Sequence, residues 1–215
     1  MIVELISKPS MDAGLLCGMG AAICYNGTNP ERSLSRAMNN GHHSVAEHAA
    51  FTFTVKGVSR VLLAQLTRHR IASYSVQSQR YCGVQVEWIV PPSIQDAGLM
   101  DDYIEQCNRC YAAYCNYILK GVPAEDARFV IPQGAACNLQ LTMNARELMH
   151  FFELRCCNRA QWEIRELAWR MMVECKEVAP DLFKFAGPGC VRGSCPEGKM
   201  TCGKPYARIP INGRA

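Results

Sequence analysis

The spacing of apolar positions in the first seventy residues predicts alternating strands and helices. The expected elements are a strand over 2–6, a helix over 11–25, a helix between Pro30 and Gly41, a strand over 51–55 that ends near Gly57, and a helix over 60–66. Asn29 before Pro30 and Ser59 before an apolar run are typical helix N-caps. Gly18 and Gly20 lack the third glycine and the strand context of a dinucleotide fingerprint, so a Rossmann domain is not supported.

The same patterns continue through the second half of the chain. The expected elements are a strand over 84–90, a long helix over 101–120, a short helix over 123–130, a strand over 138–143, and helices over 145–155 and 159–177. Pro91 and Pro92 stop the first of these strands, and Asn144 is the expected cap of the helix at 145. No long linker interrupts the first 185 residues, so we expect one domain over 1–186.

Between these halves lies a basic stretch, residues 68–81, with the sequence RHRIASYSVQSQRY. It holds three arginines and a histidine but no acid, so it is poorly suited to a core and would attract anions. An arginine fork can hold a phosphate at two points, each charge-assisted bond contributing about 1.5–3 kcal/mol. A solvated basic turn is the competing interpretation, and composition alone does not separate the two.

Composition places the chain among ordinary globular proteins, with 215 residues, 49% of them hydrophobic and 20% charged. A net charge of +4 is too small to indicate a nucleic-acid or membrane binder, but it suits a phosphorylated ligand. We find neither a basic leader with a cleavage site nor an apolar run near the roughly 20 residues of a membrane span. We therefore expect a cytoplasmic protein without a membrane segment.

The 13 cysteines do not have the spacing of a secreted disulfide framework, because their number is odd and most are scattered through expected helices and strands. We expect them to be reduced. Cys107 and Cys110 form a CxxC, but within the helix expected over 101–120 this spacing only places both on one helix face. A redox role for this pair is therefore disfavoured.

Three of the five histidines, at positions 42, 43 and 48, fall just before the strand expected at 51. Ser44 and Glu47 have the spacing of a capping box around a single helical turn, which would explain both without a function. Zinc binding is disfavoured because the HExxH order is absent. A neutral histidine that packs against an aromatic ligand or closes a polar network is the preferred interpretation.

The last part of the chain, 187–215, differs in composition and is expected to be a Gly/Pro/Cys-rich extension. Its thiols, Cys190, Cys195 and Cys202, could bind zinc, but a tetrahedral site needs a fourth ligand and the spacing matches no standard pattern. An extension without metal is the preferred interpretation. The metal alternative stays open at this point.

Four segments of the chain resemble the flavin-dependent thymidylate synthases. RHRIASYSVQSQRY resembles the RHR-x7-Ser signature of that family, and HHSVAEHAAFTF resembles its His-x-Ser-x-x-Glu-His segment before an FTF strand. GVPAEDARFVIP and TMNARELMHFFELRCCNRAQWEIR resemble its proline-arginine segment and its final helical block. Their order and distances agree from about residue 40 to 170, so the resemblance covers most of the chain.

The resemblance implies an α/β fold of the α+β type, in which an antiparallel central sheet is flanked by helices. It also implies a homotetramer whose active sites are each assembled from several subunits. FAD would be the bound cofactor, reduced by NADPH, with methylenetetrahydrofolate as the one-carbon donor. The substrate would be deoxyuridylate (dUMP) and the product dTMP, with no nucleic acid or membrane as partner.

Carried over position by position, the resemblance assigns two groups of residues. The FAD group comprises Ser44, Arg68, His69, Arg70, Asn144, Arg146 and His150, with His48 close to the flavin. The dUMP group comprises Gln65, Arg68, Gln77, Ser78, Gln79, Arg80, Arg128 and Arg155. Many family members have Asn-Glu where this chain has Ser75-Val76, so any ligand contact at Val76 would have to come from its backbone.

Arg155 and Ser78 are the residues expected to act in catalysis. dUMP must become nucleophilic at C5, and a guanidinium facing N3 can stabilise the N3-deprotonated ring; one such donor is worth about 10²–10³ in rate. We expect Arg155 to be that group. Ser78 lacks an evident base with an orienting acid, so we expect it to position dUMP by hydrogen bonding rather than to attack it. Cys82 lies next to the motif without an activating partner.

Two other functions fit parts of the sequence. A non-enzymatic nucleic-acid binder would use the arginine clusters and the basic tail, but acids are interspersed and no nucleic-acid module is recognisable. A flavoprotein reductase acting on another nucleotide would oxidise NADPH without forming dTMP. Both remain alternatives to the thymidylate synthase.

Overall fold

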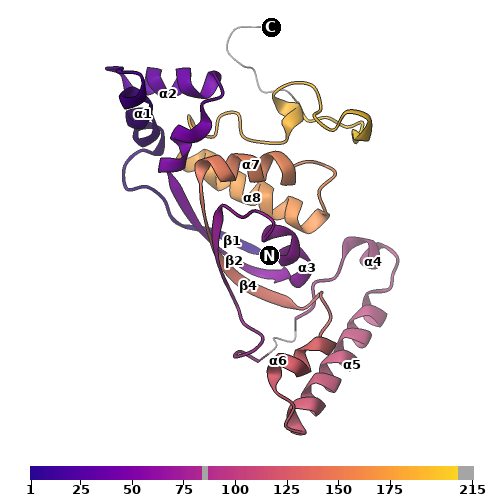
Figure 1. Ribbon diagram of the computed structural model, residues 1–215. Helices are drawn as coiled ribbons and strands as arrows, with labels where there is room; N and C mark the ends of the chain where they lie inside the picture. Colours follow the sequence, from indigo (N-terminus) through magenta and orange to yellow (C-terminus); the bar gives the residue numbers. More distant parts are fainter. Residues whose placement is uncertain (84–86, 208–215) are drawn as a thin grey trace. The chain divides into compact units, whose positions relative to one another are not determined.

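The computed structural model describes residues 1–83 and 87–207, and Figure 1 labels its α-helices and strands β1, β2 and β4. In chain order the elements are β1 (Ile2–Ser7), α1 (Ala13–Cys24), α2 (Pro30–Asn39), the 3₁₀ helix η1 (His43–His48), β2 (Ala50–Ser59), α3 (Arg60–Leu66), β3 (Ala72–Val76), α4 (Pro92–Asp96), α5 (Met100–Leu119), α6 (Ala124–Ala127), the 3₁₀ helix η2 (Arg128–Val130), β4 (Ala136–Asn144), α7 (Ala145–Arg155) and α8 (Trp162–Val178). Two short 3₁₀ helices follow, η3 (Gly189–Val191) and η4 (Gly198–Met200). The chain is therefore a mixed helix and sheet protein, as expected.

The strands form one antiparallel sheet in the order β1-β2-β4-β3. The register of β2 against β4 is visible in two contacts: the hydroxyls of Thr52 and Thr142 lie 2.9 Å apart, and Gly57 N donates to Asn138 Oδ1 at 3.0 Å. Gly57 has a φ of +67°, a conformation that costs glycine little. This allows β2 to continue to Ser59, past the end expected from the sequence.

The described chain forms two compact units, neither of them continuous in sequence. The first unit comprises residues 1–2, 55–68 and 74–140, and the second comprises 3–54, 69–73 and 141–207, each without the undescribed positions. Strands β2 and β4 each contribute residues to both units. The organisation expected from the sequence, one domain over 1–186 with an extension after it, stays a prediction.

The second unit is built around a cluster of phenylalanine rings from β2, α7 and the segment after α8. The rings of Phe51 and Phe183 lie 5.4 Å apart edge to face, Phe152 and Phe183 lie 6.1 Å apart, and all three side chains are fully buried. Aromatic pairs of this kind each contribute about 0.5–1.5 kcal/mol beyond the burial of their area. This cluster fixes α7, which carries several of the residues expected in the site.

Helices α1 and α2 pack closely against each other in the same unit, and Gly18 of α1 allows the close approach. A Cβ added at Gly18 would lie 2.5 Å from the carbonyl oxygen of Pro30, so only glycine permits this approach. Gly18 therefore has a packing role, in agreement with the rejection of a dinucleotide fingerprint. The N-cap expected at Asn29 is confirmed, because its side chain accepts a hydrogen bond from Arg32 N at 2.9 Å.

In the first unit, α5 packs against α6 and η2, with Tyr114 and Ala127 buried between them. Of the strand expected over 84–90, residues 84–86 lie outside the described residues, and Trp88 forms only an isolated bridge with Ala135. The expectation of a strand over 87–90 is therefore wrong. The Trp88 indole instead donates to Asn108 Oδ1 on α5 at 2.8 Å, and prolines follow at 91 and 92.

The remaining expected helices and the strand over 138–143 are confirmed to within a few residues, including the Ser59 cap of α3, which accepts from Leu62 N at 3.0 Å. Strand β3 and helix α4 were not expected. Within the two described ranges, no helix has both the length and the apolarity to cross a membrane. All 13 cysteines are free thiols, and burial raises the pKa of Cys107, which opposes a reactive thiolate at the CxxC.

Candidate active site

The basic stretch 68–81 is neither a uniform loop nor wholly exposed. Arg68 and Arg70 are exposed, but His69 between them is only 4% exposed, and residues 72–76 form β3. The expectation that this stretch stays out of the core is wrong at His69. Its acid partner, Glu147, comes from α7, 78 residues further along the chain.

His69 lies at the centre of a polar cluster in the second unit. Its Nδ1 lies 3.0 Å from Glu147 Oε1, and Arg155 Nε donates to its Nε2 at 3.0 Å. Because the Nε of arginine always carries a hydrogen, Nε2 must act as the acceptor. The imidazole is therefore neutral, with its proton on Nδ1 and donated to the Glu147 carboxylate.

The surroundings of His69 agree with this neutral state. Burial lowers the pKa of His69, and the nearby charge of Arg155 and the His150 ring lower it further, whereas the hydrogen bond that His69 donates to Glu147 acts in the opposite direction. The Phe151 ring meets the imidazole edge to face at 4.9 Å, and the His150 ring lies 5.8 Å away. The ring is thus held by packing as well as by hydrogen bonds.

Helix α7 positions this cluster through its spacing. Glu147, Phe151 and Arg155 follow one another at four-residue intervals, which places them on one helix face, and all three contact His69. The helix starts where the sequence indicated, because Asn144 accepts a hydrogen bond from Glu147 N at 2.9 Å. Sequence reasoning missed Glu147, although a carboxylate in line with Phe151 and Arg155 was a usable signal.

The predicted residues around η1 belong to the same unit, but the capping box is wrong. Helix η1 has no side-chain cap, and Ser44 already lies inside it because His42 is the N-cap residue. Glu47 instead forms an ion pair with Arg146 of α7. A Cβ on Gly20 would lie 3.0 Å from His48 Cδ2, so glycine at this position of α1 leaves room for the histidine ring.

Arg70, Arg146 and His150 are exposed and belong to the second unit, as do Ser44, His48, His69, Asn144 and Arg155. The structure therefore gathers the predicted FAD residues, with the exception of Arg68, and the predicted catalytic arginine in one unit. The predicted dUMP residues Gln65, Arg68, Gln77, Ser78, Gln79, Arg80 and Arg128 belong to the other unit.

Gln77 is held on both sides in the first unit. Its backbone N donates to Asn138 O at 2.9 Å, and its side-chain Oε1 accepts from Asn138 N at 3.3 Å. Arg60 Nη2 donates to the Gln77 carbonyl oxygen at 2.8 Å. Gln77 is therefore fixed at the end of β3, next to the half-buried Val76, with its amide nitrogen as the part left to meet a ligand.

Arg80 and Arg128 are both linked to Glu125. Arg80 Nη2 lies 2.7 Å from Glu125 Oε2, and Arg128 Nε donates to the Glu125 backbone carbonyl at 3.1 Å. Ser78 Oγ accepts from Arg80 N at 3.2 Å, which stabilises the turn that carries the arginine. Ser78 thus acts on local geometry in the structure, and within the described ranges neither a histidine nor a carboxylate hydrogen-bonds to its hydroxyl.

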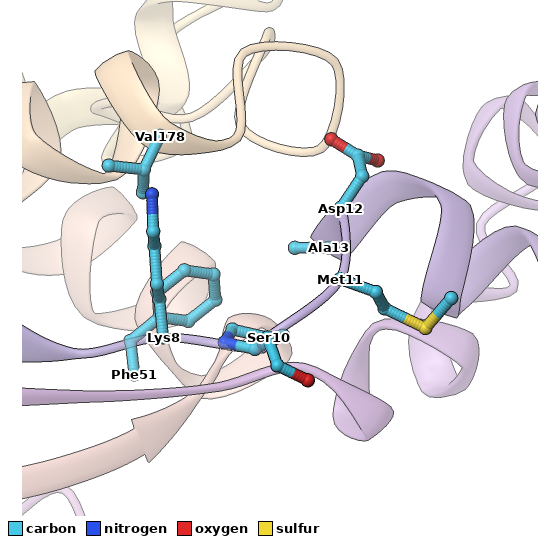
Figure 2. Close-up of a pocket in the computed structure, with 8 residues that line it drawn as sticks. Lys8, Ser10, Met11, Asp12, Ala13, Phe51 and Val178 are labelled. Atoms are coloured by element: carbon cyan, nitrogen blue, oxygen red, sulfur yellow. The ribbon is translucent and has the colours of Figure 1, made fainter.

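One cavity of about 210 Å³ opens in the second unit between β1, the start of α1 and the end of α8. Figure 2 shows the Lys8 side chain extending toward Val178, with Phe51 beside it and Asp12 turned away. None of the predicted ligand residues lines this cavity. It is therefore separate from the polar cluster around His69.

The tail packs against the loop between α7 and α8 within the second unit. Tyr206 donates from its hydroxyl to Asn158 Oδ1 at 2.6 Å, its ring lies 5.2 Å from that of Trp169, and Arg159 donates to Met200 O at 2.6 Å. Over residues 1–83 and 87–207, no group of three His, Cys, Asp or Glu side chains could hold a metal ion. The described part of the tail is thus placed by side-chain contacts.

The sequence is similar to known proteins over most of its length. A family model described as "Thymidylate synthase complementing protein" matches residues 5–181. A protein of Geobacter sulfurreducens named flavin-dependent thymidylate synthase is 54% identical over 175 residues, which cover 80% of this chain and 75% of that protein. Proteins with the same name from Clostridium tetani and Sulfolobus acidocaldarius are 49% and 48% identical; the alignments cover 80% and 72% of this chain and 76% and 60% of those proteins.

Proposed function

This chain belongs to the flavin-dependent thymidylate synthase family, and we propose from that premise that it converts dUMP to dTMP with methylenetetrahydrofolate, NADPH and bound FAD. The family assignment makes the chain an enzyme of dTMP synthesis and a flavoprotein. The main structural support for the proposal is the hydrogen bond from Arg155 Nε to His69. This bond fixes the orientation of the Arg155 guanidinium, the group that we assign to the uracil ring.

The donors of the second unit fit FAD by their chemistry. Arg70 and Arg146 present exposed guanidinium groups, and the expected FAD ligands Ser44 and His150 are exposed as well. Such a set suits the diphosphate of the cofactor, which two-point arginine contacts recognise well. Asn144 would contact FAD through its amide nitrogen, because its amide oxygen is taken by the helix cap. When bound and reduced by NADPH, FAD would supply the hydride that completes the methyl group.

Arg155 would stabilise the N3-deprotonated uracil ring of dUMP. Its guanidinium facing N3 and the flanking carbonyls favours electron density at C5, the carbon that attacks the one-carbon unit. The fixed Nε bond supports this role, since a donor that is already oriented costs no reorganisation when charge develops. Ser78 would position dUMP through hydrogen bonding and not through a covalent bond.

The phosphate of dUMP would be held in the first unit. Arg80 and Arg128 both contact Glu125, and two guanidinium groups suit a dianionic phosphate. Gln65, Arg68, Gln77 and Gln79 complete the proposed dUMP set, with Arg68 reaching both ligands. Gln77 is hydrogen-bonded to Arg60 and Asn138, which supports a role in dUMP binding mainly through holding the backbone at the end of β3 in place.

We also propose a homotetramer with active sites shared between subunits, located in the cytoplasm. Exposed apolar side chains on α1 support an association surface: Leu15, Met19 and Ile23 recur every four residues and are 38%, 46% and 83% exposed. A solution mass of four times the chain mass of 23.9 kDa supports the proposal, and a monomer at enzyme assay concentrations contradicts it.

The proposed function is tested by an omission series on purified protein with its extracted flavin identified. We expect FAD in the extract and dTMP only when dUMP, methylenetetrahydrofolate and NADPH are all present under anaerobic conditions. NADPH oxidation without dTMP would instead support a reductase, and absence of flavin binding would remove the cofactor assignment. The nucleic-acid alternative is not favoured, because the family model matches most of the chain.

A further inference from the structure

We propose that Glu147 is a positioning residue for Arg155 that acts through His69. The Glu147 carboxylate holds His69 in the Nδ1-protonated tautomer, and the Nε2 lone pair of that tautomer orients the Arg155 guanidinium. The inference rests on the proposed function, because it concerns the residue that we assign to dUMP activation.

The two hydrogen bonds of His69 depend on each other. Arg155 Nε and His69 Nε2 are 3.0 Å apart, and this distance is a hydrogen bond only while Nε2 carries no proton. The other tautomer, or the imidazolium, would bring two N–H groups face to face. Glu147, 3.0 Å from Nδ1, accepts the proton that keeps Nε2 unprotonated.

The cluster is buried, so this selection is strong. His69 is 4% exposed and Glu147 is 7% exposed, and little water is available to replace a lost partner. The edge-to-face contact with the Phe151 ring restricts rotation of the His69 imidazole. Glu147 is held in turn, because it lies in the first turn of α7, which Asn144 caps. A neutral ring between a carboxylate and a guanidinium thus connects the two charges in a fixed geometry.

The test compares kcat for dTMP formation in full-length protein with FAD, dUMP and the co-substrates at saturation. Glu147→Ala removes the acceptor, and we expect kcat to fall about 10- to 100-fold, the effect of losing one charge-assisted hydrogen bond. Glu147→Gln keeps an oxygen that can accept from Nδ1, so we expect it to retain more activity than Glu147→Ala. Glu153→Gln, the matched control, removes another carboxylate of α7, which forms a half-exposed ion pair with Arg192, and should lose less than about 3-fold.

A double-variant cycle separates positioning from a general structural role. Arg155→Lys cannot make the Nε bond, so adding Glu147→Ala to it should lower kcat by less than a further 3-fold or so. A loss in that background as large as in the wild-type background would overturn the proposal, because Glu147 would then act without Arg155.

A measurement on the wild-type protein keeps the proposal testable if Glu147→Ala does not fold. With ¹⁵N-labelled histidine, the His69 signals, identified by their absence in His69→Gln, should show a protonated Nδ1 and an unprotonated Nε2 at pH 7.5. A protonated Nε2 would overturn the inference. This spectrum needs no turnover, so a wild-type protein that makes no dTMP would defeat the proposed function without deciding the role of Glu147.

Discussion

Replacing Arg155 tests how much of the reaction depends on one oriented guanidinium. Arg155→Lys keeps a positive charge but loses the planar fork and the 3.0 Å bond from Nε to His69. That bond is worth about 1.5–3 kcal/mol, and the loss of a donor aimed at developing charge costs about 2.7–4 kcal/mol. We expect kcat to fall about 10²–10³-fold in Arg155→Lys and at least as far in Arg155→Ala.

The assay is dTMP formation at saturating dUMP, with flavin content and thermal unfolding measured on the same samples. Arg155 is half-buried at the end of α7, so both variants should remain folded and should still bind flavin. Loss of flavin together with activity would show a folding defect rather than a catalytic one. A wild-type kcat in Arg155→Ala would refute the reasoning and remove Arg155 from the role.

Three further predictions concern stability and cofactor binding. The free energy of unfolding should fall as the pH is lowered below about 6.5, by at most about 1.4 kcal/mol per pH unit from this residue, because the folded state lowers the pKa of His69 and the unfolded chain takes up the proton first. Urea titrations between pH 7.5 and 5.5 measure this, and an equally steep fall in His69→Gln would contradict it. Gly20→Ala should displace His48 and weaken FAD binding several-fold in a fluorescence titration, whereas Gly193→Ala, with no atom within 4 Å of the new Cβ, should not. Ser59→Ala should lower the free energy of unfolding by about 0.5–2 kcal/mol through loss of the α3 cap, and an unchanged urea midpoint would argue against that cap.

Much of the fold follows from local signals in the sequence. Asn144 and Ser59 mark the starts of α7 and α3 because their side chains satisfy backbone amides that a helix leaves without partners. Strand β3 was missed because arginines and serines surround it, although Ala72, Tyr74 and Val76 do alternate with polar residues. Of the strand expected over 84–90, the described positions 87–90 keep only the bridge between Trp88 and Ala135, and no local pattern encodes the contact of the Trp88 indole with α5.

The candidate site likewise has residues that the sequence indicates and residues that depend on contacts between distant segments. The sequence pattern and the resemblance singled out His69 and Arg155, but their burial and mutual contact depend on α7 meeting a segment 86 residues away. Glu147 was missed because its partner lies 78 residues earlier: the four-residue spacing to Phe151 and Arg155 indicates a shared helix face but not the residue that this face contacts. The capping box expected at Ser44 and Glu47 is wrong because its spacing does not specify where a 3₁₀ helix begins.

The most direct test of the account is dTMP formation by the purified wild-type protein beside Arg155→Ala. In the wild type, we expect dTMP from dUMP only when both NADPH and methylenetetrahydrofolate are present. We expect the Arg155→Ala protein to bind flavin but to form dTMP at least about 10²-fold more slowly. A wild-type protein that binds flavin and oxidises NADPH but forms no dTMP would contradict it.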